Sequence, residues 1–196
     1  MGRIYKLAFL SLAMNIAFSA YNIIIGCTTH SWWLFTIGAY YAVLSVIRYT
    51  VLRTKRARAV FIKRSTGILL MVMSLPLAGT VILASVQDRG IVFNEIVMII
   101  LATYAFTKIT LASVNLGKSR RSVSAKVKTL RNISFADAFV SIFSLQRSML
   151  VSFGEMAPKT IRIMNIATGS AVCIVIFFLG LNLYHSTRRD GWADQP

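Results

Sequence analysis

The sequence predicts an all-α, polytopic membrane protein with six transmembrane helices and with both the N- and C-termini in the cytoplasm. Three observations lead to this fold class. Of the 196 residues, 56% are hydrophobic and 14% are charged, whereas a soluble domain needs a more polar surface. The apolar residues are gathered in runs of about twenty, the length at which a helix crosses about 30 Å of hydrocarbon. The segments between these runs are alternately rich and poor in basic residues, which orients the helices in the membrane.

Six apolar runs are expected to form the spans of a single membrane domain that takes up residues 1–196. Their approximate limits are 7–25, 32–52, 67–86, 91–116, 133–153 and 163–184. Five of these runs are plainly hydrophobic. The fifth, 133–153, is the least hydrophobic, so its assignment as a span depends on the charge of the neighbouring loops.

The distribution of Lys and Arg divides the loops between the two sides of the membrane. The loops after the second and fourth runs and the C-terminal tail are basic, with Arg53, Lys55, Arg56, Arg58, Lys63, Arg64, Lys118, Arg120, Arg121, Lys126, Lys128, Arg131, Arg188 and Arg189. The opposite loops hold Arg89, Lys159 and Arg162. Because basic loops are retained in the cytoplasm, they are expected to face anionic lipid headgroups there. The net charge of +16 therefore reflects topology and predicts no nucleic-acid partner.

Four ionisable residues lie inside the fourth and fifth runs, where each charge costs about 2.5–3.5 kcal/mol unless it finds a partner or water. Consecutive spans are antiparallel, so residues at equal depth have a nearly constant sum of residue numbers. That sum is 242 for Glu95 with Arg147 and 245 for Lys108 with Asp137. The sequence predicts two ion pairs between these helices. The alternative is that each side chain reaches its nearer interface separately.

Polar residues recur at spacings of three and four along the fifth run, which places them on one face of a helix. This stripe consists of Ser134, Asp137, Ser141, Ser144, Ser148, Ser152 and Glu155. The first run has a shorter stripe of Ser11, Asn15, Ser19 and Asn22, and the fourth run adds Thr103, Thr107 and Thr110 beside Tyr104. Three interpretations stay open: close helix packing through small hydroxyl residues, a hydrated cavity for a solute, or a fifth segment that lies flat in the interface.

The residue patterns of common catalytic and metal sites do not occur in this sequence. The two histidines, His30 and His185, are expected on opposite sides of the membrane, and metal-ligand spacing is absent. Neither a P-loop nor a dinucleotide fingerprint is present. We therefore expect no cofactor and no metal, and assign no catalytic residue. An enzyme that uses a single intramembrane carboxylate as acid or base is the third-ranked functional class.

Four short stretches resemble a known group of proteins: SWW at 31–33, GAYY at 38–41, NISFADA at 132–138 and SMLVSFG at 148–154. They are similar to small, functionally uncharacterised multi-spanning proteins of Gram-positive bacteria over most of the chain. That resemblance implies a multi-pass protein of a bacterial plasma membrane and carries no activity or site residues. The chain also resembles the substrate-binding subunits of energy-coupling-factor vitamin transporters. These are six-helix proteins of this size with small residues four apart in the first helix, as Ala13 and Ala17 are here.

The coincidence of polar stripes with intramembrane charge favours a transport-related protein. It would bind or pass a polar solute in a cavity between the first, fourth and fifth helices. The residues expected to line this cavity are Asn15, Glu95, Tyr104, Lys108, Asp137, Ser141, Ser144 and Arg147. The alternative is a non-catalytic membrane adaptor or accessory subunit. Its basic loops would meet a protein partner, or its helices a second copy of the chain.

Overall fold

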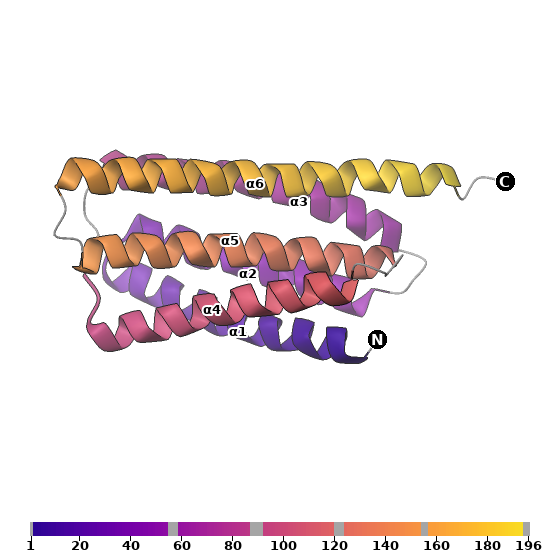
Figure 1. The fold of residues 1–196 in the computed structure, drawn as a ribbon, viewed down its shortest axis with the longest axis horizontal. Helices are drawn as coiled ribbons and strands as arrows, with labels where there is room; N and C mark the ends of the chain where they lie inside the picture. The colour runs from indigo at the N-terminus through magenta and orange to yellow at the C-terminus, as the bar shows by residue number, and fades with distance from the viewer. Residues whose placement is uncertain (1, 55–58, 87–91, 120–123, 154–156, 194–196) are drawn as a thin grey trace.

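The computed structural model describes residues 2–54, 59–86, 92–119, 124–153 and 157–193, which form six α-helices. In chain order these are α1 (Gly2–Thr28), α2 (Trp32–Arg53), α3 (Ala59–Val86), α4 (Glu95–Ser119), α5 (Ala125–Phe153) and α6 (Pro158–Ala193). The helices run alongside one another and alternate in direction, so the start of α1 and the end of α6 lie at the same end of the bundle (Figure 1). The predicted all-α class is confirmed.

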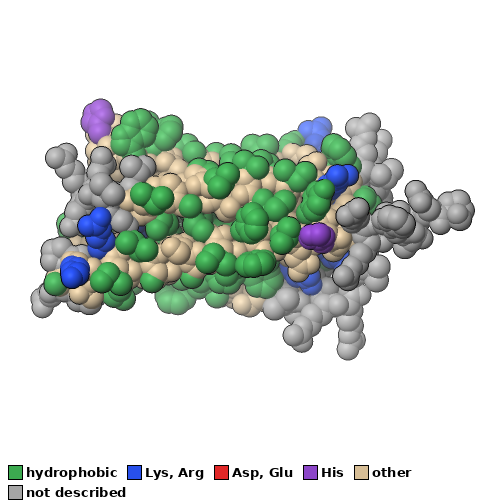
Figure 2. Space-filling model, turned by 90° about the horizontal axis from the view of Figure 1, so that it is seen from above, with side chains coloured by type: hydrophobic (Ala, Val, Ile, Leu, Met, Phe, Trp, Pro, Cys, Tyr) green, Lys and Arg blue, Asp and Glu red, His purple; other side chains and the backbone are tan. Residues whose placement is uncertain are grey.

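Five of these helices are long and apolar enough to cross a membrane, judged by length and composition. Their candidate spans are Lys6–Thr28, Trp32–Arg53, Val60–Ile82, Glu95–Asn115 and Lys159–Thr187. Large apolar side chains such as Phe9, Leu75 and Ile96 are more than 60% exposed. Figure 2 shows hydrophobic side chains over the middle of one face and Lys and Arg toward its two ends. An apolar surface of this extent does not suit water, so the chain is a multi-spanning membrane protein.

The helix α5 is not among those five, yet it lies inside the bundle. In Figure 1 it runs the length of the molecule between α6 and α4. Its side chains Ile133, Ala136, Val140 and Phe143 are fully buried. A helix that contacts other helices on most sides needs less apolar surface than one that faces lipid. This buried position favours a fifth helix that runs with the others over one that lies flat in the interface.

Several helices extend beyond the predicted spans. Helices α3 and α5 each begin eight residues before the expected starts at 67 and 133, and α6 continues to Ala193. Helix α4 begins at Glu95, after residues 92–94, which are described and not helical, and the expected first residue, Ile91, lies outside the described residues. The predicted loop cations Lys55, Arg56, Arg58, Arg89, Arg120 and Arg121, and Glu155 at the end of the polar stripe, also lie outside the described residues.

The helices pack mainly in three pairs: α1 with α2, α4 with α5, and α3 with α6. In the last pair the two backbones approach closely at two glycines. A Cβ atom added to Gly67 would lie 2.9 Å from the carbonyl oxygen of Gly180, and one added to Gly180 would lie 2.7 Å from that of Gly67. Such an approach of two backbones requires small residues on both helices. The other two pairs meet around a polar interior.

Candidate functional site

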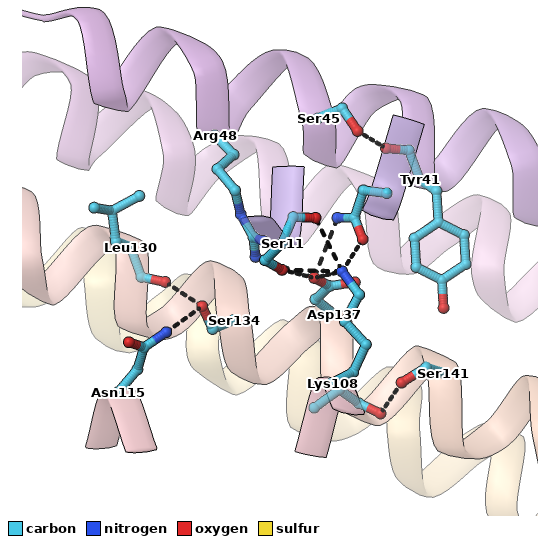
Figure 3. A network of polar contacts seen from close by, with 12 residues as sticks. Ser11, Tyr41, Ser45, Arg48, Lys108, Asn115, Leu130, Ser134, Asp137 and Ser141 are labelled. Carbon is cyan, nitrogen blue, oxygen red and sulfur yellow. Dashed lines mark hydrogen bonds and ion pairs between the residues drawn. The ribbon is translucent and has the colours of Figure 1, made fainter. Parts of the chain in front are cut away.

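Side chains from four helices meet at the carboxylate of Asp137, which lies on α5 (Figure 3). Its Oδ2 atom lies 2.8 Å from Nζ of Lys108 on α4 and 3.1 Å from Nη2 of Arg48 on α2. The same oxygen accepts hydrogen bonds from two residues of α1, Oγ of Ser11 at 3.3 Å and Nδ2 of Asn15 at 3.1 Å. One carboxylate therefore joins α1, α2, α4 and α5.

Lys108 is surrounded by oxygen atoms. Its Nζ donates to the carbonyl oxygen of Ser11 at 3.2 Å, to Oγ of Ser11 at 3.0 Å and to Oδ1 of Asn15. The hydroxyl of Tyr104 donates to the same Asn15 oxygen at 3.1 Å, so the Asn15 amide is used at both ends. We call these six residues the Asp137 cluster: Ser11, Asn15, Arg48, Tyr104, Lys108 and Asp137.

The Asp137 cluster is buried near the middle of the bundle. Exposed fractions are 0% for Arg48, 2% for Lys108 and 1% for Asp137. Asp137 follows the first residue of α5 by twelve positions, or about 18 Å at the usual helical rise. Three charges at this depth are tolerated because both cations contact the carboxylate. Removing one partner of a buried pair typically costs about 3–5 kcal/mol.

The pairing within the cluster is incomplete. Among the described residues, no hydrogen-bond partner is found for Nε and Nη1 of Arg48 or for Oδ1 of Asp137. Tyr41 lies seven residues before Arg48 on α2, hence on the same helical face, and its ring contacts that of Tyr104 edge-on with centroids 6.0 Å apart. A buried polar group without a partner costs about 1–3 kcal/mol. In native proteins such groups are typically satisfied by water, an ion or a ligand.

The predicted ion pair between Lys108 and Asp137 is confirmed. Four of the eight residues expected to line a cavity belong to the cluster: Asn15, Tyr104, Lys108 and Asp137. Ser141 and Ser144 are buried one and two turns further along the same face of α5. The hydroxyl of Ser141 donates to the carbonyl oxygen of Ala138 at 2.8 Å.

The second predicted ion pair, between Glu95 and Arg147, is wrong: none joins these two described residues. Glu95 is exposed at the first turn of α4. It precedes Lys108 by thirteen residues, which at about 100° per residue places it on nearly the opposite face of the helix. The guanidinium of Arg147 lies 4.5 Å from the centroid of the Trp33 ring. Glu95 and Arg147 are expected at equal depth, but their side chains lie on helix faces that do not meet.

The polar stripe of α1 faces the interior, whereas that of α4 does not. Ser19 and Asn22 are buried like the two cluster residues of α1, and Oγ of Ser19 donates to the carbonyl oxygen of Gly38 at 2.7 Å. By contrast, Thr103 and Thr110 are exposed, and their hydroxyls donate to carbonyl oxygens one turn earlier in α4 at 2.8 and 2.9 Å. The interior polar surface therefore comes chiefly from α1 and α5.

Arg48 is the cluster residue that the sequence analysis did not single out. It stands five residues before the end of α2, beside the basic loop, where a cation is explained by topology alone. Its position inside the second apolar run, on one helical face with Tyr41 and Ser45, is the sequence feature that distinguishes it from the loop cations. Figure 3 shows these three side chains along the same stretch of α2.

The chemistry open to the Asp137 cluster follows from its own groups. No protein-family model and no curated protein matches this chain. Within the described ranges, no three His, Cys, Asp or Glu side chains gather where a metal ion could be held. The cluster atoms without a partner among the described residues are Nε and Nη1 of Arg48 and Oδ1 of Asp137, and such groups suit a small polar molecule held by charge and hydrogen bonds.

Proposed function

We propose that this protein is transport-related and binds a small polar solute at the Asp137 cluster. One observation carries the proposal: three ionisable side chains are buried at the centre of the bundle, and their contacts with one another leave polar atoms of Arg48 and Asp137 without partners. Ionisable residues inside membrane bundles mark substrate and ion pathways, because a charge there is costly. The proposed site lies between α1, α2, α4 and α5, and thus includes one helix more than the sequence indicated.

The same proposal includes six spans, with α5 as the fifth, and both termini in the cytoplasm of a bacterial cell. Two features support it. The start of α1 and the end of α6 share one end of the bundle, as an even number of crossings requires. The described cations Arg53, Arg64 and Lys128 lie at or near helix ends on that side, whereas Lys159 and Arg162 begin α6 on the other. By the positive-inside rule, the first side is cytoplasmic and faces anionic headgroups.

A role in packing alone is the competing explanation, and it suits an adaptor or accessory subunit. Against it stands the general cost of buried ion pairs: well-packed apolar side chains of similar size often stabilise a protein as well or better. The serine stripes of α1 and α5 can serve either role, because small hydroxyl residues both allow close packing and hydrate a cavity. The two roles differ in whether water and solutes can reach the cluster.

Cysteine accessibility tests the proposal directly. In a background of Cys27→Ser and Cys173→Ser, Ser11→Cys and Ser141→Cys place a thiol beside the cluster. The matched control is Ile142→Cys, the next residue of α5, which is 37% exposed on the outside of the bundle. If solute reaches the cluster from water, a charged methanethiosulfonate reagent modifies the two interior thiols at least ten times faster than the control. Equal, negligible reactivity at all three positions rejects the solute-binding function. A stoichiometric protein partner in gentle detergent then identifies the chain as an adaptor.

A further inference from the structure

We infer that the solute held by the Asp137 cluster is a small monovalent anion. This inference rests on the proposed function and adds the chemical class of the solute. It follows from the number of charges in the cluster, the positions of the other acidic residues and the donors that remain free on Arg48.

The cluster carries one positive charge in excess. Arg48 keeps its proton under all physiological conditions. Lys108 is also protonated, because three oxygens that can only accept hydrogen bonds surround its Nζ: Oδ2 of Asp137, the carbonyl oxygen of Ser11 and Oδ1 of Asn15. Three acceptors need three N–H groups, and only an ammonium has them. Two cations therefore share one carboxylate.

No second carboxylate lies at the same depth in the sequence. The chain has six acidic residues, none of them before position 88, and Asp137 is the sole one between 96 and 154. Glu95 stands thirteen residues from Lys108, or about 20 Å along α4. By position, the remaining four fall between helices or near the C-terminus. Because an unbalanced charge is costly in an apolar interior, a bound monovalent anion would complete the cluster.

The donors for such an anion are already in place. Nε and Nη1 of Arg48 have no partner among the described residues, and the Arg48 side chain is 0% exposed. Hydrogen bonds from a guanidinium to an anion are among the strong ones. Figure 3 shows Arg48 and Lys108 reaching Asp137 from different helices. The free Oδ1 of Asp137 would repel further negative charge, so a monovalent anion fits better than a divalent one.

Calorimetric titration of the purified protein in neutral detergent tests this inference. The probes are chloride, nitrate and formate, each added at constant ionic strength against bulky gluconate, with sulfate as the divalent comparison. We expect saturable binding of at least one monovalent probe, at least tenfold tighter than sulfate. Absence of binding by all three monovalent anions overturns the anion assignment.

Two variants of the cluster should change the affinity for the anion in opposite directions, which a merely structural role would not produce. Arg48→Gln should weaken binding of the best probe at least tenfold, because it removes the free donors. Asp137→Asn should tighten it at least threefold, because it removes the negative charge beside the anion. Lys63→Gln is the matched control: it removes another buried cation, on α3 and outside the cluster, and should change the affinity less than twofold. Weakening by both cluster variants overturns the inference, and the wild-type titration decides alone if a variant does not fold.

Failure of the anion class can be told apart from failure of the solute-binding function. If ammonium or a neutral polyol binds and the anions do not, the anion class is wrong while solute binding stands. If no probe binds and the thiols of Ser11→Cys and Ser141→Cys also resist aqueous reagent, both are wrong.

Discussion

Replacing Asp137 with Asn keeps the size of the side chain and removes the charge that Arg48 and Lys108 both contact. Contacts of 2.8 and 3.1 Å correspond to roughly 6 and 5 kcal/mol of Coulombic attraction at an effective dielectric constant of about 20. Most of this attraction offsets the desolvation of the ions, so breaking a buried pair lowers stability by about 3–5 kcal/mol. Because Asn still offers an oxygen to one cation, we expect Asp137→Asn to lower the free energy of unfolding by about 3 kcal/mol.

The assay is reversible unfolding in mixed micelles, in which helicity is followed by circular dichroism as dodecyl sulfate is added. Ser144→Ala is the control, since it changes another buried polar residue on the same face of α5 and should cost less than about 1 kcal/mol. The charge-free combination of Arg48→Met, Lys108→Met and Asp137→Leu should recover most of the loss, because no buried charge is left without a partner. If Asp137→Asn unfolds within 1 kcal/mol of the wild type, the carboxylate does not stabilise two cations and the reasoning is refuted.

The same unfolding assay checks three further predictions. Gly67→Ala should lower stability by about 1–3 kcal/mol, because the new methyl group meets the backbone of α6, whereas Gly79→Ala, with nothing within 4 Å of the new Cβ, should be neutral or stabilising by up to about 1 kcal/mol. Lys126→Met should cost about 1–2 kcal/mol, because Nζ donates to two carbonyl oxygens at the end of α2 at 2.8 and 3.0 Å; an unchanged midpoint would contradict this capping role. Arg147→Leu should cost at least about 1 kcal/mol through loss of the cation–π contact with Trp33, and Trp33→Leu should then add little in the double variant.

The sequence was sufficient for the helical class and for the centre of the candidate site, because both depend on depth. Runs of apolar residues locate the helices, and the matching depths of Lys108 and Asp137 on consecutive antiparallel helices predict their contact. The structure adds that this contact is one of several made by a single carboxylate oxygen.

The depth of a residue in the membrane does not determine which neighbouring helix its side chain faces. The wrong predictions have this cause. Glu95 and Arg147 are at matching depths, yet Glu95 is exposed and Arg147 contacts α2. The pairing of Arg48 with Asp137 does not follow from the sequence, because α2 and α5 are separated by two helices in the chain. The exposed threonines of α4 illustrate the same limit, since their hydroxyls bond to their own helix.

The shared carboxylate also has a consequence for biosynthesis. Arg48 and Lys108 are synthesised before Asp137, and chains fold from the N-terminus as they are made. Helices α2 and α4 are therefore made while each holds a cation whose counter-charge has not yet been translated. A cation at a helix centre costs about 2.5–3.5 kcal/mol, and Arg48, five residues from the end of α2, costs less than Lys108. Once α5 is made, its Asp137 pairs with both cations. This attraction favours a position of α5, the least apolar helix, between its neighbours. The contacts of Asp137 with α2 and α4 therefore add to the low hydropathy of α5 in holding it between its neighbours.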